Sequence, residues 1–381
     1  MTDISSGMVN QMMDTALRST RRQVASAVAA STALAGSGHA LRNRRAATQP
    51  TTPRAKPVHK RPAHTPAAPR SSRARGISSR LNPHEAHQGR AISAGGVRRF
   101  ELWVPPGTRA RQRLPLVVML HGCKQDIESF RGSTRMQLIG NKERFCVLFI
   151  EQARVANPMR CWNWFALKSG KALSEISIIR AAIRQVCDKF PIDPHAVALV
   201  GLSAGAGMAG LLASRHPDEF VAVAMHAGVP PGMTVNARHA LAAMKGERES
   251  APLTLGDSEI LPPLLVVQGE ADHVVAPSNA VEAVTQWAAA CEAEPEPVRT
   301  SRRGKRYPMK ITDYTANGRL CARLCQIETL GHAWSGGNKR HAYSDPEGPD
   351  ASLMSWRFIA EVIQQRRPRS SVARKHKEPG R

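Results

Sequence analysis

Apolar residues in this 381-residue chain gather into two kinds of segment, short continuous runs and longer stretches with helical spacing. The short runs predict strands, at 98–104, 116–120, 147–150, 197–200, 221–225, 264–267 and 323–329. The longer stretches predict helices, at 174–190, 204–214, 278–291 and 352–365. Strands that alternate with helices are typical of an open, mostly parallel sheet with helices on both faces. In such an α/β fold, the residues that bind and react lie at the carboxyl ends of strands.

Composition divides the chain into three parts. Residues 1–95 are predicted to form a basic, largely disordered arm, because much of this region is Pro, Ser, Thr, Ala and Arg and cannot bury enough apolar surface to fold. Within the arm, apolar residues recur at near-helical spacing over 7–35 with arginines between them, which predicts an amphipathic helix. Residues 96–365 are predicted to form one globular domain, and 366–381 a second basic, disordered tail.

The net charge of +24 is concentrated in the two tails. Residues 1–100 hold 17 Lys and Arg against three acidic residues, and 366–381 hold seven against one. Such tails bind anionic surfaces electrostatically, and the scarcity of aromatic side chains within them argues against sequence-specific contacts. They therefore predict attachment to an anionic membrane or non-specific contact with nucleic acid. The central part of the chain is close to neutral, which disfavours nucleic-acid binding as the main function.

The N-terminus lacks the pattern of a standard secretory signal. No uncharged apolar region follows a basic start, and the mildly apolar segment 24–36 begins too late. No apolar run approaches the length of a transmembrane helix. The N-terminus by itself therefore favours a cytoplasmic location.

The pentapeptide Gly201-Leu202-Ser203-Ala204-Gly205 is the strongest chemical signal in the chain. It follows a predicted strand and precedes a predicted helix, which is the context of a nucleophile elbow. A serine at such a corner adopts a strained backbone and presents its hydroxyl above the sheet. Side chains at the two glycines would clash across the turn. Ser203 is therefore the predicted nucleophile.

A serine nucleophile needs a base and a carboxylate that orients it, and at an elbow of this kind the chain order is Ser, then Asp or Glu, then His. Asp272 follows the strand predicted at 264–267 and is the preferred carboxylate, with Glu270 and Asp257 as alternatives. His332 follows the last predicted strand and is the predicted base, because it comes after the acid in sequence. The sequence thus predicts a Ser-Asp-His triad.

The segment after the strand at 116–120 is predicted to supply an oxyanion hole. That strand runs directly into His121-Gly122-Cys123, a small turn whose backbone N–H groups can approach a developing oxyanion. The predicted donors are the N–H of Cys123 and the N–H of Ala204, the residue after the nucleophile. His121 is interpreted as a structural histidine in preference to a catalytic one.

Four motifs give the chain a family resemblance. They are LVVMLHGC at 116–123, CWNWF at 161–165, GLSAG at 201–205 and GHAWSGG at 331–337. Together they resemble the esterases of the poly(3-hydroxybutyrate) depolymerase family, over about 98–337. The resemblance implies an α/β-hydrolase fold, with Ser203 as nucleophile, Asp272 as orienting carboxylate and His332 as base.

The same resemblance implies hydrolysis of carboxylic esters. Polyhydroxyalkanoate polymer or oligomers are the first expected substrates, and feruloyl or acetylxylan-type esters are the alternative. It also implies an extracellular location, which the N-terminus does not support, and it adds a polymer granule to the surfaces that the basic tails could contact.

Two departures from the family pattern affect the expected shape of the pocket. The family more usually has two glycines where this chain has Ala206 and Gly207, and His where it has Gln268.

Aromatic residues in these motifs are expected to contact substrate. Trp162 and Trp164 are predicted to wall the site, because indole offers a large apolar area and one hydrogen-bond donor. Trp334 and His121 are further expected substrate contacts. The alternative for the tryptophans is a place in the core beneath the sheet, where spacing by two residues would put Trp162 and Trp164 on one side.

The chain has seven cysteines. Cys123 and Cys161 each lie within a family motif, so the resemblance implies that they could meet as a disulfide. Cys321 and Cys325 lie in a predicted strand, where residues four apart are about 13 Å from each other, too far to share one metal. No metal site is therefore expected. The sequence also has no P-loop and no G-x-G-x-x-G after a predicted strand, and no cofactor is expected. The remaining alternative is an inactive member of the fold that binds a surface or nucleic acid.

Overall fold

The computed structural model of this protein describes residues 86–366, apart from 233, 235, 248–252 and 254–259. The helix predicted at 7–35, most of the basic arm and nearly all of the C-terminal tail lie outside these residues. Among the helices that are described, none is long and apolar enough to cross a membrane.

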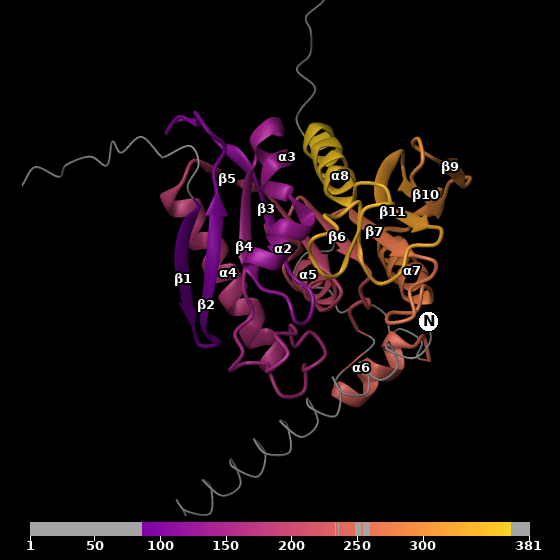
Figure 1. Ribbon diagram of the computed structural model, residues 1–381, viewed down its shortest axis with the longest axis horizontal. Coiled ribbons are helices and arrows are strands. Elements are labelled where there is room, and N and C mark those ends of the chain that lie inside the picture. Colours follow the sequence, from indigo (N-terminus) through magenta and orange to yellow (C-terminus); the bar gives the residue numbers. More distant parts are fainter. Residues whose placement is uncertain (1–85, 233, 235, 248–252, 254–259, 367–381) are drawn as a thin grey trace, which may run out of the picture. The chain divides into compact units, whose positions relative to one another are not determined.

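An 11-stranded sheet forms the centre of the described chain, in the order β1-β2-β4-β3-β5-β6-β7-β11-β10-β8, with β9 paired to β10 (Figure 1). Strands β4, β3, β5, β6, β7 and β11 are parallel neighbours, and the pairs at either end are antiparallel. The strands are β1 (His87–Ser93), β2 (Gly96–Trp103), β3 (Leu114–Leu120), β4 (Cys146–Ile150), β5 (Ile192–Leu202), β6 (Ala222–His226), β7 (Leu264–Gly269), β8 (Glu294–Pro295), β9 (Arg299–Ser301), β10 (Met309–Ala316) and β11 (Arg319–Ile327). A small separate ladder joins β12 (Trp334–Ser335) to β13 (Ser344–Asp345).

Helices cover both faces of this sheet. They are α2 (Ile127–Thr134), α3 (Met136–Glu143), α4 (Lys171–Lys189), α5 (Ala204–Arg215), α6 (Ala237–Met244), α7 (Ser278–Cys291) and α8 (Ala351–Arg366). Helices α4, α5 and α7 pack into one apolar core, and α2, α3 and α8 into another. The open, mostly parallel sheet with helices on both faces that the alternation predicted is confirmed, and with it the α/β-hydrolase fold that the family resemblance implies.

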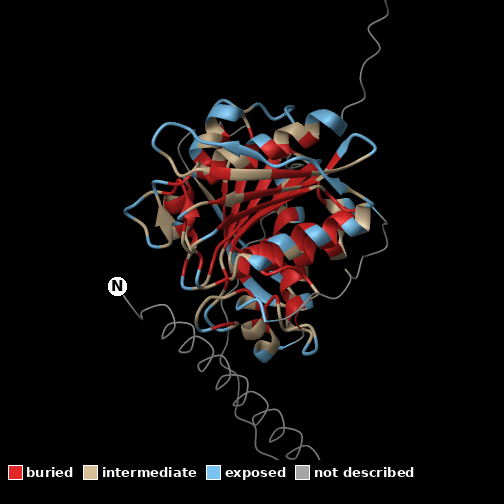
Figure 2. Cartoon of the chain, turned by 90° about the vertical axis from the view of Figure 1, so that its right-hand side faces the viewer, coloured by how far each residue is buried: buried red, intermediate tan, exposed pale blue. Residues whose placement is uncertain are grey.

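The alternation of side chains along the strands produces the two cores. In β3, Leu116, Val118 and Leu120 belong to the core beneath α4 and α5, whereas Val117 and Met119 belong to the other. Central parallel strands are buried on both faces, which is why they appear in the sequence as continuous apolar runs. Figure 2 shows the buried residues gathered in these strands and on the sides of the helices that face them.

The domain begins earlier than the sequence predicted. The boundary expected between residues 95 and 96 is wrong, because β1 pairs along its whole length with β2 and belongs to the sheet. Its segment HQGRAIS alternates between exposed and buried positions at the edge of the sheet, so it lacks the apolar run of a central strand.

Other elements also differ from the prediction. Strands β8, β9 and β10 and helices α2, α3 and α6 were not predicted. Helices α2 and α3 have eight residues each and are separated at Arg135, which adopts a left-handed conformation, so each is too short for a clear periodic pattern. The CWNWF motif forms a loop, so the strand-like alternation expected for its tryptophans is also wrong.

Candidate active site

The loops that follow β3, β4, β5, β7 and β11 carry the predicted site residues. These strands all run parallel in the sheet, with β6 between β5 and β7, so their carboxyl ends lie at one edge. Every residue predicted as nucleophile, base, acid or oxyanion donor follows one of these strands in sequence.

Ser203 occupies a sharp corner between β5 and α5. Its backbone has φ 55° and ψ −118°, a conformation that side-chain-bearing residues rarely adopt. Its N–H donates to the carbonyl oxygen of His226 at 2.8 Å, which ties the corner to the neighbouring strand β6. The flanking glycines leave no room for a side chain. A Cβ at Gly205 would lie 2.1 Å from the Leu120 oxygen, and one at Gly201 would lie 2.3 Å from the Gly205 oxygen.

The structure brings Ser203, His332 and Asp272 together in one hydrogen-bonded chain. Nε2 of His332 lies 3.1 Å from Oγ of Ser203, and Nδ1 of His332 lies 2.8 Å from Oδ2 of Asp272. With a neutral imidazole, the only arrangement that satisfies both contacts is a proton on Nδ1 donated to the carboxylate and a lone pair on Nε2 facing the hydroxyl. This is the geometry in which a base can remove the serine proton.

Asp272 is almost fully buried and is held by several donors. Burial opposes its ionisation, but hydrogen bonds from His332 and from the N–H groups of Val274 and Val275 outweigh it, so the pKa of the carboxyl lies below its usual value. Nε2 of Gln268 makes a further contact, 3.1 Å from Oδ2. The carboxylate therefore stays charged beside the imidazole.

The alternative acids have different surroundings. Glu270 is directed to an ion pair with Lys310 at 3.0 Å and has no hydrogen bond to His332 within the described residues. Asp257 lies outside the described residues.

The turn that carries Asp272 and the loop that carries His332 are in contact through their backbones. The N–H of Ala271 donates to the carbonyl oxygen of Leu330 at 3.1 Å. A Cβ at Gly269 would lie 2.1 Å from that same oxygen, so only glycine permits the approach. This contact sets the distance between the two segments that carry Asp272 and His332.

One N–H in the turn after β3 remains open. In this turn, the N–H of Gly122 donates to Oε1 of Gln125, that of Lys124 donates to the Met159 oxygen, and that of Gln125 returns to the Gly122 oxygen. Within the described residues, the N–H of Cys123 has no protein acceptor.

Ala204 offers a second open donor. Its N–H begins α5, where the first backbone donors of a helix have no intrahelical partner, and it too lacks an acceptor among the described residues. One open N–H is on the residue after the nucleophile, and the other is in the turn whose first residue, His121, packs against Gly205. Such donors suit the stabilisation of an oxyanion.

Cys123 is joined to Cys161 by a disulfide, with their Cα atoms 4.2 Å apart. The bond links the turn after β3 to the CWNWF loop, 38 residues further along the chain. Because the open N–H belongs to one of the bonded cysteines, the cross-link restrains the position of that donor.

His121 is buried next to the site and makes structural contacts. Its Nε2 accepts from the N–H of Gln152 at 3.0 Å, and its Nδ1 lies 2.7 Å from the Gly122 oxygen. Burial lowers its pKa to about 4, which keeps the ring neutral. The expectation that His121 contacts substrate is therefore not met, whereas its interpretation as a structural residue fits these contacts.

The three tryptophans predicted as substrate contacts lie mainly in the core. Trp162 and Trp334 are 0% and 1% exposed, so the expectation that they line the site is wrong for both. Trp334 instead stacks on His226, with ring centroids 5.0 Å apart, and its Nε1 donates to Ser352. It therefore anchors the loop that carries His332. Trp164, 7% exposed, packs against the first turn of α5 at Gly207 and is the one that lies beside the nucleophile corner.

Two buried polar residues near the site, His226 and Glu175, were not predicted. His226 accepts the N–H of Ser335 on its Nε2, and burial lowers its pKa to about 3. Glu175 is buried in α4 and accepts hydrogen bonds from the CWNWF loop. A signal for Glu175 did exist, because it shares the apolar face of its helix with Ile176 and Ile179.

Comparisons with known proteins find relatives among depolymerases and esterases. The chain is 30% identical over 243 residues to poly(3-hydroxyalkanoate) depolymerase C from Paucimonas lemoignei, a match that covers 60% of this chain and 56% of the relative. It is 24% identical over 192 residues to feruloyl esterase B from Neurospora crassa, which covers 45% and 63%. Among solved structures, the acetyl xylan esterase from Aspergillus awamori shares the fold, with a TM-score of 0.58, 16% identity and coverage of 72% of this chain and 99% of that one.

The chain spans about half the length of the depolymerase from Paucimonas lemoignei. The family model for the PHB depolymerase esterases matches residues 98–291, slightly more than half of this chain. That match includes the strands β3 to β7, the corner at Ser203 and the turn with Asp272. The chain therefore belongs to the PHB depolymerase family of esterases.

Proposed function

We propose that this protein is a serine esterase that hydrolyses carboxylic esters through an acyl-enzyme. The observation that carries the proposal is the hydrogen-bonded chain from Asp272 through His332 to Ser203, beside the open N–H groups of Cys123 and Ala204. Each component of acyl transfer has a candidate: a nucleophile, a base with a fixed tautomer, an orienting carboxylate and two donors for an oxyanion.

The reaction then proceeds in two halves. Nε2 of His332 takes the proton of Ser203 as Oγ bonds to the ester carbonyl carbon, and the oxyanion that forms accepts from Cys123 and Ala204. When the carbon–oxygen bond to the alcohol breaks, His332 returns the proton to the departing oxygen. Water repeats the sequence on the acyl-enzyme, giving the carboxylic acid and free Ser203.

Esters of 3-hydroxyalkanoates, as polymer or oligomers, are the proposed substrates. The support is family membership and the similarity to a relative named poly(3-hydroxyalkanoate) depolymerase C. Feruloyl or acetylated polysaccharide esters are the second candidate, because relatives named feruloyl esterase B and probable acetylxylan esterase A also match the chain.

The basic tails are proposed to attach the enzyme to a surface, either a polymer particle or an anionic membrane. They carry most of the net charge of +24 and lie outside the segment matched by the family. An extracellular location is proposed for the catalytic domain, because a disulfide such as Cys123–Cys161 persists in an oxidising compartment.

A substrate panel combined with covalent labelling tests the proposal. Hydrolysis is measured on p-nitrophenyl butyrate, a 3-hydroxybutyrate oligomer, methyl ferulate and acetylated xylan, with and without a serine-directed phosphonate. We expect ester turnover that the phosphonate abolishes, with the label found on Ser203 by peptide mass spectrometry. Ser203→Ala and His332→Ala should each lower kcat by roughly 10³-fold or more, and the double variant should lose little beyond either. Absence of turnover and label would leave an inactive, surface-binding member of the fold.

A further inference from the structure

One buried carboxylate, that of Glu175, has no part in the triad, and its contacts lead to the turn at 121–125 after β3, here called the oxyanion turn. Glu175 lies in the second turn of α4 and is 2% exposed, on a helix face that otherwise packs apolar side chains into the core. Burial raises the pKa of its carboxyl, whereas the hydrogen bonds it accepts and the charge of Arg98 act in the opposite direction. A buried acid is costly unless hydrogen-bonded partners compensate for the lost hydration, so its contacts indicate what it does.

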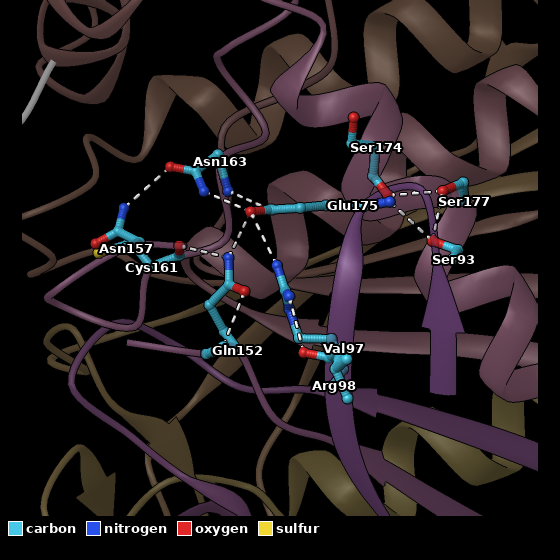
Figure 3. A network of polar contacts seen from close by, with 12 residues as sticks. Ser93, Val97, Arg98, Gln152, Asn157, Cys161, Asn163, Ser174, Glu175 and Ser177 are labelled. Carbon is cyan, nitrogen blue, oxygen red and sulfur yellow. Dashed lines mark hydrogen bonds and ion pairs between the residues drawn. The ribbon is translucent and has the colours of Figure 1, made fainter. Parts of the chain in front are cut away.

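Glu175 is the centre of a polar network that reaches three separate segments (Figure 3). Its Oε2 accepts the backbone N–H of Asn163 at 2.7 Å, and its Oε1 accepts the side-chain amides of Asn163 and Gln152, the latter at 2.7 Å. Arg98 of β2 lies 3.6 Å from Oε1 as its ion-pair partner. One carboxylate therefore holds the CWNWF loop, the end of β4 and the start of β2.

Two hydrogen-bonded routes lead from Glu175 to the oxyanion turn. In the first, Nε2 of Gln152 also donates to the Cys161 oxygen at 3.0 Å, and Cys161 is bonded to Cys123. The backbone N–H of Gln152 in addition fixes the ring of His121, the residue that opens the turn.

The second route passes through the amides of the loop. Nδ2 of Asn157 donates to Oδ1 of Asn163 at 3.0 Å, and Oδ1 of Asn157 accepts the N–H of Met159 at 3.0 Å. The Met159 oxygen then accepts the N–H of Lys124 at 2.7 Å. The turn at Cys123 is thus held on both sides by groups whose positions depend on Glu175.

We propose that Glu175 is a positioning residue for the oxyanion hole, which sets the direction of the Cys123 N–H through the CWNWF loop and the disulfide. The inference rests on the proposed function, because the hole matters only if Ser203 attacks an ester. Glu175 does not touch the substrate. Its effect is confined to the oxyanion, a charge that exists in the transition state and not in the bound ester, so it acts on kcat and not on KM.

The test is the substitution Glu175→Gln. Glutamine keeps the shape of the side chain, but it replaces one carboxylate oxygen with an NH2 group that faces the donors of Asn163, Gln152 and Arg98. The concentration of active sites is first titrated with the phosphonate, so that misfolded protein does not enter the rates. We expect kcat per titrated site to fall by about 10- to 100-fold, less than the roughly 10²–10³ that loss of a whole oxyanion donor costs. KM should change by less than about twofold, and affinity for a trifluoromethyl ketone analogue of the tetrahedral intermediate should fall in parallel with kcat.

A second variant, Asn163→Ala, removes the amide that joins Glu175 to Asn157 and keeps the pair with Arg98. If the Glu175→Gln protein does not fold, this variant provides the test instead. We again expect kcat to fall while KM changes by less than about twofold. The matched control is Asp313→Asn, which alters a carboxylate on β10 that is bound by Arg299 and Arg323, at the other end of the sheet. The control should lose stability while kcat and inhibitor affinity stay unchanged.

The outcomes separate this inference from the proposed function. If the wild-type protein hydrolyses esters and labels at Ser203, but both network variants keep kcat within about twofold per titrated site, Glu175 is merely structural and the inference is wrong. An equal loss in Asp313→Asn would also overturn it, because the effect would then follow from lowered stability. Failure of the wild-type protein to label or turn over would instead refute the proposed function.

Discussion

Nε2 of Gln268 lies 3.1 Å from Oδ2 of Asp272, the same oxygen that faces Nδ1 of His332. The Gln268 amide also contacts the carbonyl oxygens of Gly269 and Val275, so its own position is fixed by the backbone. An amide remains a donor at every pH at which proteins fold, whereas the histidine more usual in the family titrates. The carboxylate therefore has a permanent side-chain donor in addition to the imidazole.

Replacing Gln268→Leu should lower kcat by roughly 10- to 100-fold, because a hydrogen bond to a charged group contributes about 1.5–3 kcal/mol and its loss leaves the carboxylate less well oriented. Gln268→His is the matched control, since an imidazole can supply an N–H in place of the amide. It should retain more activity than the leucine variant. Steady-state rates on p-nitrophenyl butyrate make the comparison, and equal rates in the wild type and Gln268→Leu would show that this donor is unimportant.

The two carboxylates after β7 should differ sharply in their effect on catalysis. Asp272→Asn should lower kcat by about 10³-fold or more with the fold intact, because an amide favours the wrong imidazole tautomer. Glu270→Gln removes only the exposed pair with Lys310, and such pairs contribute little, so kcat should stay within about twofold. The reverse order of effects would assign the orienting role to Glu270. Circular dichroism of both variants checks the fold.

The low pKa of Asp272 should be visible in the pH dependence of stability. As the pH falls, an aspartate in the unfolded chain takes up a proton at about pH 3.9, whereas Asp272 in the native protein stays ionised to a lower pH. Its contribution to the free energy of unfolding is therefore fully present above that pH and is lost as the pH falls through the lower native pKa. The difference in unfolding free energy between the wild type and Asp272→Asn should narrow below pH ~4. Urea unfolding at a series of pH values measures it, and a constant difference would contradict the assignment.

Two truncations that differ by ten residues should separate the tail from the domain. Removal of residues 1–85 should leave hydrolysis of a small soluble ester within about twofold, since no site residue lies there. It should weaken binding to anionic vesicles or polymer particles, and added salt should mimic the loss, because exposed charges are screened beyond about 8 Å at physiological ionic strength.

Removal of residues 1–95 additionally deletes β1, which pairs with β2 and contacts α4 through Ser93 and Ser177. Thermal unfolding should then shift down by roughly 5 °C or more, because each kcal/mol lost corresponds to about 2–4 °C in a domain of this size. Equal melting temperatures for the two truncations would show that β1 is dispensable. Loss of small-ester turnover on removal of 1–85 alone would place part of that segment in the domain.

Complete burial makes the central strands the most predictable part of the fold. Strands such as β4 and β6 are buried at every position and appear as apolar runs, and motif order then placed Ser203, Asp272 and His332 at strand ends. Edge strands could not be found in this way. The residues of β1 alternate between the two faces of the sheet, and β8 and β9 are short and fully exposed. The sequences of these strands therefore resemble those of loops.

The surroundings of the site were harder to predict because they depend on contacts between distant segments. Nothing in the local sequence shows that Trp162 and Trp334 point into the core, since an indole suits a binding wall and a core equally well. The partners of Glu175 come from segments that lie before it in the chain, and only the folded sheet brings them together. The local sequence pattern indicates which kind of residue occupies a position, whereas the residues that it contacts are determined by the topology of the fold.

The backbone of Ser203, with φ 55°, has a consequence for the thermodynamics of the whole domain. A non-glycine residue in such a conformation costs about 1–3 kcal/mol, so the nucleophile is maintained at the expense of native-state stability. Ser203→Gly should relieve this cost, whereas Ser203→Ala keeps the Cβ and the strain. Both variants lose the hydroxyl, so their difference reports the backbone strain. Glycine has greater freedom in the unfolded chain, which offsets part of the gain, and we expect the free energy of unfolding of Ser203→Gly to exceed that of Ser203→Ala by roughly 1 kcal/mol. Chemical denaturation of the pair measures this trade-off between stability and activity, and a glycine variant no more stable than the alanine variant would place the cost elsewhere in the fold.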